Sequence, residues 1–477
     1  MKSRDLRFGL GVFVASLGLL LLRFLVPRPI GMADNGDGWR LLCQLGGRQL
    51  DRPSEGFVRF SYGSAPPCDS AYVSSQAWLD WAAGKIGALF GASGVLNLLV
   101  LGVLTCVLVA GAITVTVLGL DLNRRNRLIA TVLLLLVMGD SAFFGYFASV
   151  LSEGAAFLGI LLICGGLFLV HRPGKLRWAG AAVTVLGGLV GINAKSQTLL
   201  LIPLFALALL LTRPSGARGR KRWALPLAVL AIVGAGTLAI QSQGDPANAE
   251  YREANMYHAI FDSIVDGKHD TKADLVALGL PESFEQYVGT GWWGERAAWH
   301  DPLYPRYRDK ISRRNVLHYY ATHPGRTAEI LQQGGVDALT ARPENLGSFG
   351  ELSGQPRLSK EYRVPVFSGL AALVAPLGLF VLVPVWVLIG WAGVRAFRRN
   401  RREYGIVAFL LVFFAAGQLG LSALGEGIEG VKHQLLTLFP TVLAVVFAVL
   451  SLLPRAETAP EQTEDEDPAE EEIPAAV

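Results

Sequence analysis

Residues 95–120 read VLNLLVLGVLTCVLVAGAITVTVLGL, a run that contains no charged side chain. About 20 apolar residues are enough for an α-helix to cross the hydrocarbon core of a bilayer. The run therefore predicts a transmembrane helix. Nine further apolar stretches, two of them short, continue the pattern along the chain: 8–26, 128–139, 154–170, 178–192, 198–212, 224–240, 364–391, 405–421 and 435–453.

The composition agrees with this pattern. The 477 residues are 52% hydrophobic and 17% charged, with a mean hydropathy of +0.40, whereas soluble domains average about a quarter charged residues. We predict an all-α polytopic membrane protein with about ten transmembrane helices and a small helical extracytoplasmic insert. The composition argues against a soluble secreted enzyme and against nucleic-acid binding. Four cysteines are too few for a dense disulfide framework.

Clusters of Lys and Arg predict the topology, because cytoplasmic loops are enriched in these residues. With ten spans, every such cluster lies on the same side of the membrane as the N-terminus: 2–7, 124–127, 171–177, 213–222 and 395–402. We therefore expect a multi-pass protein of the cytoplasmic membrane with both termini in the cytoplasm. The loops that carry the unusual polar residues then face outward.

The spans and loops predict four parts. Residues 1–240 form an N-terminal transmembrane bundle with an outer loop at 27–94, 241–363 form an extracytoplasmic helical domain, and 364–454 form the C-terminal transmembrane helices. Residues 455–477 are strongly acidic and predict a disordered cytoplasmic tail.

Two of the four cysteines, Cys43 and Cys68, lie in the first outer loop. The outer side of the membrane is oxidising, so we predict a disulfide between them. Two free thiols are the alternative.

The glycine-rich stretch 31–40 (GMADNGDGWR) follows the first span and contains Asp34 and Asp37. Two carboxylates three residues apart can converge on one site, where they accept a proton or hold a divalent cation such as Mg²⁺ or Mn²⁺. A solvated turn is the alternative, since Asn, Gly and Asp favour turns for backbone reasons alone.

A second polar group lies in the aromatic turn between the third and fourth spans. Asp140 and Glu153 bracket this turn, and Tyr146 lies within it. Ionisable groups at membrane depth usually face a wet cavity, because burying them in hydrocarbon is costly. These residues are candidates for substrate binding, with helix capping as the alternative.

Two later outer turns also carry charge. Lys195 and Gln197 interrupt an apolar hairpin, and the last outer turn adds four more candidate residues: Glu426, Glu429, Lys432 and His433. A cation here can bind a phosphate, or it can anchor the turn at the headgroups. Carboxylates and cations that share one face suit a reaction in which a base activates a hydroxyl while cations neutralise a departing phosphate.

The layout resembles the GT-C superfamily of membrane glycosyltransferases, and more narrowly the bacterial surface-glycan hexose transferases. The resemblance rests on the order of four short motifs along the chain: ADNGD at 33–37, YFASVLSE at 146–153, KSQ at 195–197 and DLVALGLP at 274–281. It implies an inverting hexosyltransferase with a polyprenyl-phosphate sugar donor, a glycan, lipid-linked or protein acceptor, and a site that faces outward among membrane lipids. It also implies that Asp34 or Asp37 is the general base.

A transporter or flippase of lipid-linked glycans is the rival interpretation. Such a protein is expected to contain paired broken helices in inverted repeats, and no internal repeat is evident in the sequence. A noncatalytic assembly protein is a third possibility. Trp292, Trp293 and Trp299 can stack on a sugar ring, but core packing or membrane contact is the preferred interpretation.

Overall fold

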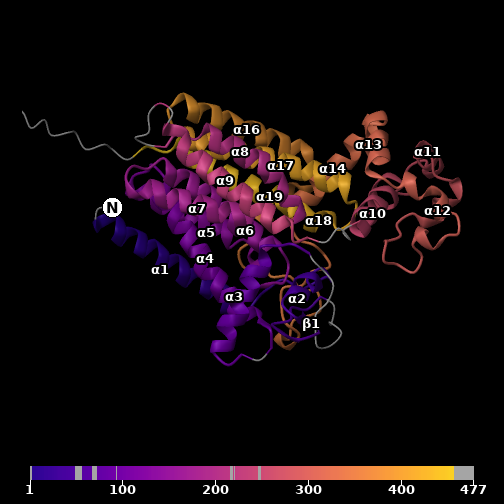
Figure 1. Ribbon diagram of the computed structural model, residues 1–477, viewed down its shortest axis with the longest axis horizontal. Coiled ribbons are helices and arrows are strands. Elements are labelled where there is room, and N and C mark those ends of the chain that lie inside the picture. The colour runs from indigo at the N-terminus through magenta and orange to yellow at the C-terminus, as the bar shows by residue number, and fades with distance from the viewer. Residues whose placement is uncertain are drawn as a thin grey trace, which may run out of the picture.

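The computed structural model describes residues 3–48, 56–66, 72–92, 94–214, 219, 221–244 and 249–455. Long apolar helices form a bundle, and a lobe of short helices (α10 to α13) lies at one end of it (Figure 1). The N-terminus lies at the opposite end of the bundle (Figure 1). The predicted all-α polytopic fold is confirmed.

Within the described ranges, eight helices are long and apolar enough to cross a membrane. They are α1 Ser3–Leu25, α4 Leu98–Gly119, α6 Glu153–Val170, α7 Lys175–Ile192, α9 Lys221–Gln241, α16 Leu379–Arg398, α17 Arg402–Gly425 and α18 Gly430–His433, which continues as α19 Leu435–Leu452. Each corresponds to one of the ten predicted spans. The remaining two predicted spans, 128–139 and 198–212, correspond to α5 Arg124–Met138 and to the pair η2 Ser196–Leu200 and α8 Leu201–Leu211.

The prediction that residues 364–391 form a single helix was wrong. Its first part is α15 Val366–Val374, followed by the short turn η9 Ala375–Leu377, and α16 begins only after Gly378. Gly378 has a φ of +49°, a conformation that favours glycine and interrupts an α-helix. An apolar run shows hydrophobic length but does not reveal such a break.

Helix α6 lies at the centre of the bundle, where every one of its residues is buried. Small residues let α7 approach it closely: a Cβ added at Gly159 would lie 2.3 Å from Gly191, and one at Gly166 would lie 2.3 Å from Thr184. Close packing of small residues is a main source of helix association in membranes. The rigid α6 therefore holds its first residue, Glu153, in a defined position.

The segment between α1 and α4 forms a small outer unit that the sequence did not predict in detail. It contains α2 Trp39–Gln44, β1 Gly47–Arg48, β2 Ser61–Ser64, α3 Gln76–Leu89 and β3 Leu96–Asn97, with the strands paired antiparallel in the order β1-β2-β3. Between α5 and α6 lies the turn η1 Phe144–Ala148. Cys43 is disulfide-bonded, and its predicted partner Cys68 lies outside the described residues.

The outer lobe has a hydrophobic core of its own, which includes Tyr257, Phe261, Phe284 and Tyr319. Its elements are α10 Ala249–His258, the π-helix η4 Ala259–Ile264, α11 Thr271–Ala277, η5 Glu282–Tyr287, η6 Ala298–His300, α12 Tyr304–Tyr307, η7 Arg308–Lys310, α13 Arg313–Thr322 and the first part of α14 Pro324–Thr340. The turn η8 Glu351–Ser353 lies in a segment that instead contacts the unit between α1 and α4, where Val58 N donates to Phe349 O. The end of α14 packs into the core of the bundle instead, through Ala338 and Leu339.

One buried carboxyl in the outer unit yields a stability prediction. Asp80 on α3 is 0% exposed, one of its oxygens accepts from Gln76 Nε2 at 2.9 Å, and the other has no partner in the described part of the chain. Burial raises the pKa of Asp80 to about 8. Between pH of about 4 and 8 the folded protein therefore holds a proton that the unfolded chain releases, so stability falls as the pH rises.

We therefore expect Asp80→Asn to stabilise the protein at neutral pH by on the order of a few kcal/mol. The gain should be absent near pH 4 and should grow up to about pH 8, as measured by thermal unfolding in detergent. The same substitution at the exposed Asp309 is the control. A difference that stays constant over this pH range would contradict the prediction.

Candidate active site

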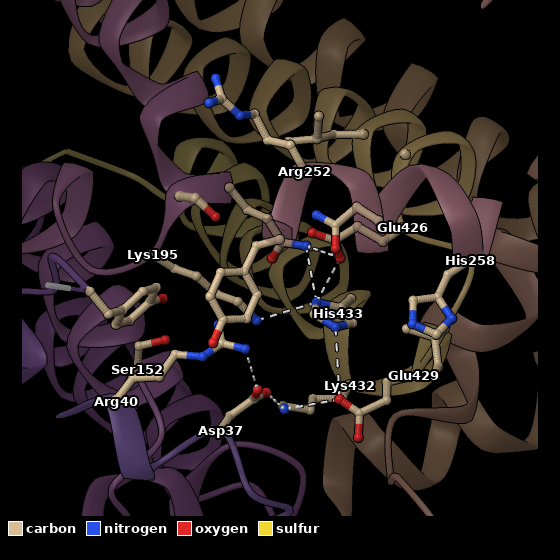
Figure 2. A pocket seen from close by; sticks show the side chains of 18 of the residues that line it. Asp37, Arg40, Ser152, Lys195, Arg252, His258, Glu426, Glu429, Lys432 and His433 are labelled. Carbon is tan, nitrogen blue, oxygen red and sulfur yellow. Dashed lines mark hydrogen bonds and ion pairs between the residues drawn. The ribbon is translucent and has the colours of Figure 1, made fainter. Parts of the chain in front are cut away.

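A cavity of about 1460 Å³ lies where the bundle meets the outer lobe. Its wall combines the loop after α1, the start of α6, the turn before α8, the α17–α18 turn and the helix α10. Figure 2 shows that Asp37, Lys195, Lys432 and His433 converge on this space although they are far apart in the sequence.

The loop after α1 separates the roles of its two aspartates. Asp34 Oδ1 accepts hydrogen bonds from the backbone amides of Gly36, at 3.0 Å, and Gly38, at 2.8 Å. A Cβ at Gly38 would lie 2.2 Å from Val150, so this position requires glycine. Burial raises the pKa of Asp34, although the two amides oppose this effect. Asp34 therefore shapes the turn that presents Asp37, and it does not line the cavity.

Asp37 lines the cavity and is held by two cations. Lys432 Nζ forms an ion pair with Asp37 Oδ2, and Arg40 lies 3.3 Å from Asp37 Oδ1. Burial raises the pKa of Asp37, but the charges of Lys432, Lys195 and Arg40 outweigh it and hold the pKa well below its usual value. Asp37 is therefore ionised at neutral pH.

Lys432 is 1% exposed and bridges two acids. Its Nζ lies 3.1 Å from Glu429 Oε2, and Glu429 also accepts hydrogen bonds from Asn35 at 2.6 Å and from Asn345 at 2.9 Å. Burial raises the pKa of Glu429, but Lys432 and His433 lower it by more, so the net shift is downward. The last outer turn is thereby tied to the Asp37 loop.

A second cation site lies beside the first. Lys195 Nζ is 3.0 Å from Glu153 Oε1 and 3.2 Å from His433 Nδ1. Glu426 Oε2 lies 2.8 Å from the same His433 nitrogen and 2.7 Å from Gln197 Nε2. Burial lowers the pKa of Lys195, but Glu153 and Glu426 raise it, and the net shift is upward, so the ammonium form is favoured.

Eight of the eleven predicted site residues line the cavity: Asp37, Glu153, Lys195, Gln197, Glu426, Glu429, Lys432 and His433. The structure does not bring the other three to the cavity wall. Besides Asp34 these are Asp140, which is 0% exposed and accepts from the amides of Phe367 at 2.7 Å and Ser368 at 3.1 Å, and Tyr146. Asp140 thus caps α15, which was the alternative interpretation.

Tyr146 is 0% exposed and packs edge-on against Phe157, with ring centroids 5.9 Å apart. Sequence reasoning assigned it to substrate binding because it lies in an outer aromatic turn. The turn instead packs into the core of the bundle.

Several cavity residues were not assigned from the sequence. Arg40 stacks on Tyr251 of α10, with its guanidinium carbon 4.0 Å from the ring centroid, and thereby links the Asp37 loop to the outer lobe. Its position three residues after Asp37 could have indicated from the sequence that the two side chains pair. Trp293 is 61% exposed and lines the cavity, whereas Trp292 is 8% exposed and packs in the lobe core.

Metal binding was left open by the sequence. Among the described residues, no three His, Cys, Asp or Glu side chains are grouped as a metal site requires. Asp37 and Glu429, the nearest carboxylates, share the ammonium group of Lys432. In the described residues, these two carboxylates are therefore paired with a cationic side chain.

Apolar spans enclose a carboxylate and several cations at one end of the bundle, and this arrangement agrees with a membrane glycosyltransferase of GT-C type. The family model described as the YfdI N-terminal transmembrane domain matches residues 3–467. The chain belongs to this family of GT-C-type enzymes, and the resemblance to the GT-C superfamily inferred from the sequence motifs is confirmed.

No curated protein matches the chain. Two solved structures from Archaeoglobus fulgidus are similar at 13% identity over 93% of this chain: an oligosaccharyltransferase tethered to an acceptor peptide, with a TM-score of 0.38, and the oligosaccharyltransferase AglB in complex with an inhibitory peptide and a dolichol-phosphate, with a TM-score of 0.41. The chain spans about half the length of these proteins, 48% and 50% respectively.

Proposed function

We propose that this protein transfers a hexose from a polyprenyl-phosphate donor to a glycan, lipid-linked or protein acceptor on the extracytoplasmic face of the cytoplasmic membrane. The transfer inverts the anomeric centre, and Asp37 is the general base. The observation that carries the proposal is the ionised Asp37 beside Lys432, Lys195 and Arg40 in one cavity.

In the proposed reaction, Asp37 takes the proton of the acceptor hydroxyl as its oxygen attacks the anomeric carbon. The bond between that carbon and the phosphate oxygen breaks, and its electron pair stays on the phosphate. Negative charge therefore moves from Asp37 to the leaving group, while the total charge stays constant. Lys432, Lys195 and Arg40 are the cations that stabilise the charge at its new position.

The ion pairs of Asp37 with Lys432 and Arg40 weaken it as a base before the donor binds. Asp37 is a weak base while Lys432 and Arg40 bind it, because both cations lower its pKa. An anionic donor competes with Asp37 for the same cations. Each cation that binds the phosphate instead of Asp37 raises the pKa of Asp37 and makes it a stronger base. Donor binding then prepares the base before the acceptor reacts.

The apolar part of the cavity suits the lipid of the donor. Leu200, Leu421 and Leu424 line it together with Gly417 and Gly420 of α17. Leu200 follows Lys195 and Gln197 in the chain, and the α17 residues line the same cavity as these two side chains. A polyprenyl tail along α17 would place its phosphate at the two lysines.

The orientation of the chain is part of the proposal. The basic clusters lie on α5, α7, α9 and α16 at the ends remote from the outer lobe, where the N-terminus also lies (Figure 1). The positive-inside rule then assigns those ends to the cytoplasm and the cavity to the outer side.

The direct test is transfer of radiolabelled hexose from synthetic polyprenyl-phosphate hexoses by the purified protein in detergent. We expect release of free polyprenyl phosphate together with a glycosylated acceptor. Binding of the donor, or its passage across a vesicle membrane, without any turnover would favour the transporter instead.

Gly420 offers a test of the lipid path. A Cβ added at this glycine meets nothing within 4 Å, so Gly420→Phe fills the cavity without a backbone clash. We expect kcat/KM to fall by roughly 10²-fold with a long-chain donor, and much less with a short-chain donor. Gly234→Phe on α9 is the control, because this glycine is equally open and does not line the cavity. Equal losses with both chain lengths would contradict the proposed path.

A further inference from the structure

Two buried oxygens in the cavity wall lack a hydrogen-bond partner in the described part of the chain: Glu153 Oε2 and Gln197 Oε1. Glu153 is 1% exposed and Gln197 is 2% exposed, and both residues line the cavity. Leaving a buried acceptor unpaired costs about 1–3 kcal/mol. Two such oxygens in the wall of one cavity point to a ligand that supplies hydrogen-bond donors.

Neighbouring contacts hold both side chains in these orientations. Glu153 Oε1 is bound to Lys195 at 3.0 Å. Gln197 Nε2 donates to Glu426 at 2.7 Å, so turning the amide over would bring two acceptor oxygens together. The backbone carbonyl of Gln197 is also fixed, because Gln418 Nε2 donates to it at 2.6 Å. The unpaired oxygens are therefore preorganised.

The position of these oxygens indicates which part of a ligand they meet. Lys195 and His433 together link the two side chains: Lys195 Nζ binds Glu153 Oε1 at 3.0 Å, and His433 Nδ1 lies 3.2 Å from Lys195 Nζ and 3.1 Å from Gln197 Nε2. A phosphate at Lys195 would carry its sugar within reach of Glu153 and Gln197, because the sugar is bonded to the phosphate oxygen. The hydroxyl groups of that sugar are hydrogen-bond donors.

We infer that Glu153 and Gln197 accept hydrogen bonds from two hydroxyl groups of the transferred hexose and thereby select the sugar. The inference rests on the proposed function and assigns the donor class as a neutral hexopyranose with free hydroxyls at both positions. A site built to bind a hydroxyl rejects an analogue that lacks it, because its own polar group is then left unpaired.

The test combines variants with donors that each lack one hydroxyl. For the wild-type protein, we expect removal of two particular hydroxyls to lower kcat/KM by about 10- to 100-fold each, and removal of the others to have little effect. Gln197→Met removes an acceptor at similar size. In this variant the penalty for one of the two hydroxyls should shrink to less than about threefold, while the other penalties stay.

Glu153→Gln provides a second comparison of this kind, since it replaces a charged acceptor with a neutral one. In this variant, removal of the other hydroxyl from the donor should lower kcat/KM by less than it does in the wild type. Gln243→Met, the same change at an exposed glutamine that does not line the cavity, is the control and should keep the wild-type pattern. Penalties that are equal in wild type and both variants would overturn the inference, and so would a wild type indifferent to every hydroxyl. Those outcomes leave hexose transfer itself intact. Absence of transfer from any hexose donor by the wild type would instead overturn the proposed function and this inference with it.

Discussion

Asp37→Asn is expected to lower kcat for hexose transfer by roughly 10²- to 10⁴-fold, the usual contribution of a general base. The amide has nearly the same shape as the carboxylate but cannot accept the proton of the acceptor hydroxyl. Donor binding should persist, because Lys432 and Lys195 remain and one acid that competes with the phosphate is lost. The measurement is single-turnover transfer beside equilibrium binding of the labelled donor.

Asp34→Asn is the matched comparison. The asparagine oxygen can still accept from the amides of Gly36 and Gly38, so we expect most of the activity to remain. Asp34→Ala loses these bonds and should lower thermal stability as well as activity. Full loss of chemistry in Asp34→Asn, with an active Asp37→Asn, would transfer the role of base to Asp34.

Lys432→Gln is expected to have the second large effect, on both stability and transfer. Removing this buried cation leaves Asp37 and Glu429 without their shared partner, and breaking a buried pair in this way costs about 3–5 kcal/mol. Transfer should fall as well, because Lys432 is the cation closest to the proposed path of charge from Asp37 to the phosphate. Unfolding in detergent and single-turnover transfer are the two readouts.

A double variant separates these two effects. Lys432→Gln combined with Glu429→Gln removes one buried negative charge along with the positive one, so much of the stability should return. Transfer should not return, because the cation is still missing. Recovery of both would show that Lys432 acts only by holding the fold.

The pKa directions at this cluster set the pH dependence of stability. Asp37 and Glu429 both have lowered pKa values in the folded protein, so the folded state binds fewer protons than the unfolded chain below pH of about 4–5. Their stabilising effect is complete above the unfolded pKa and is lost as the pH falls through the folded pKa. Asp80 acts in the opposite direction, since its pKa is raised to about 8.

Much of the candidate site could be predicted from the sequence because ionisable residues are costly in apolar surroundings. Lys195, Glu426 and Lys432 were noticeable for that reason alone, and all three line the cavity. The same reasoning failed for Asp140, because a helix cap and a substrate ligand look alike when only residue type and approximate depth are known. It also could not rank Asp34 against Asp37, which differ in backbone contacts and not in composition.

The sequence by itself determined the membrane class and the ten apolar segments, because hydrophobic length is a property of local composition. The charge asymmetry of the loops predicts the outer face on which the charged turns gather. Tertiary structure decided which charges meet. Lys432 lies 395 positions from Asp37 along the chain and pairs with it, and Arg40 reaches Tyr251 of the outer lobe. Such contacts depend on how α6, α17 and α18 pack around one cavity, and close packing of distant small residues leaves no local signal in the chain.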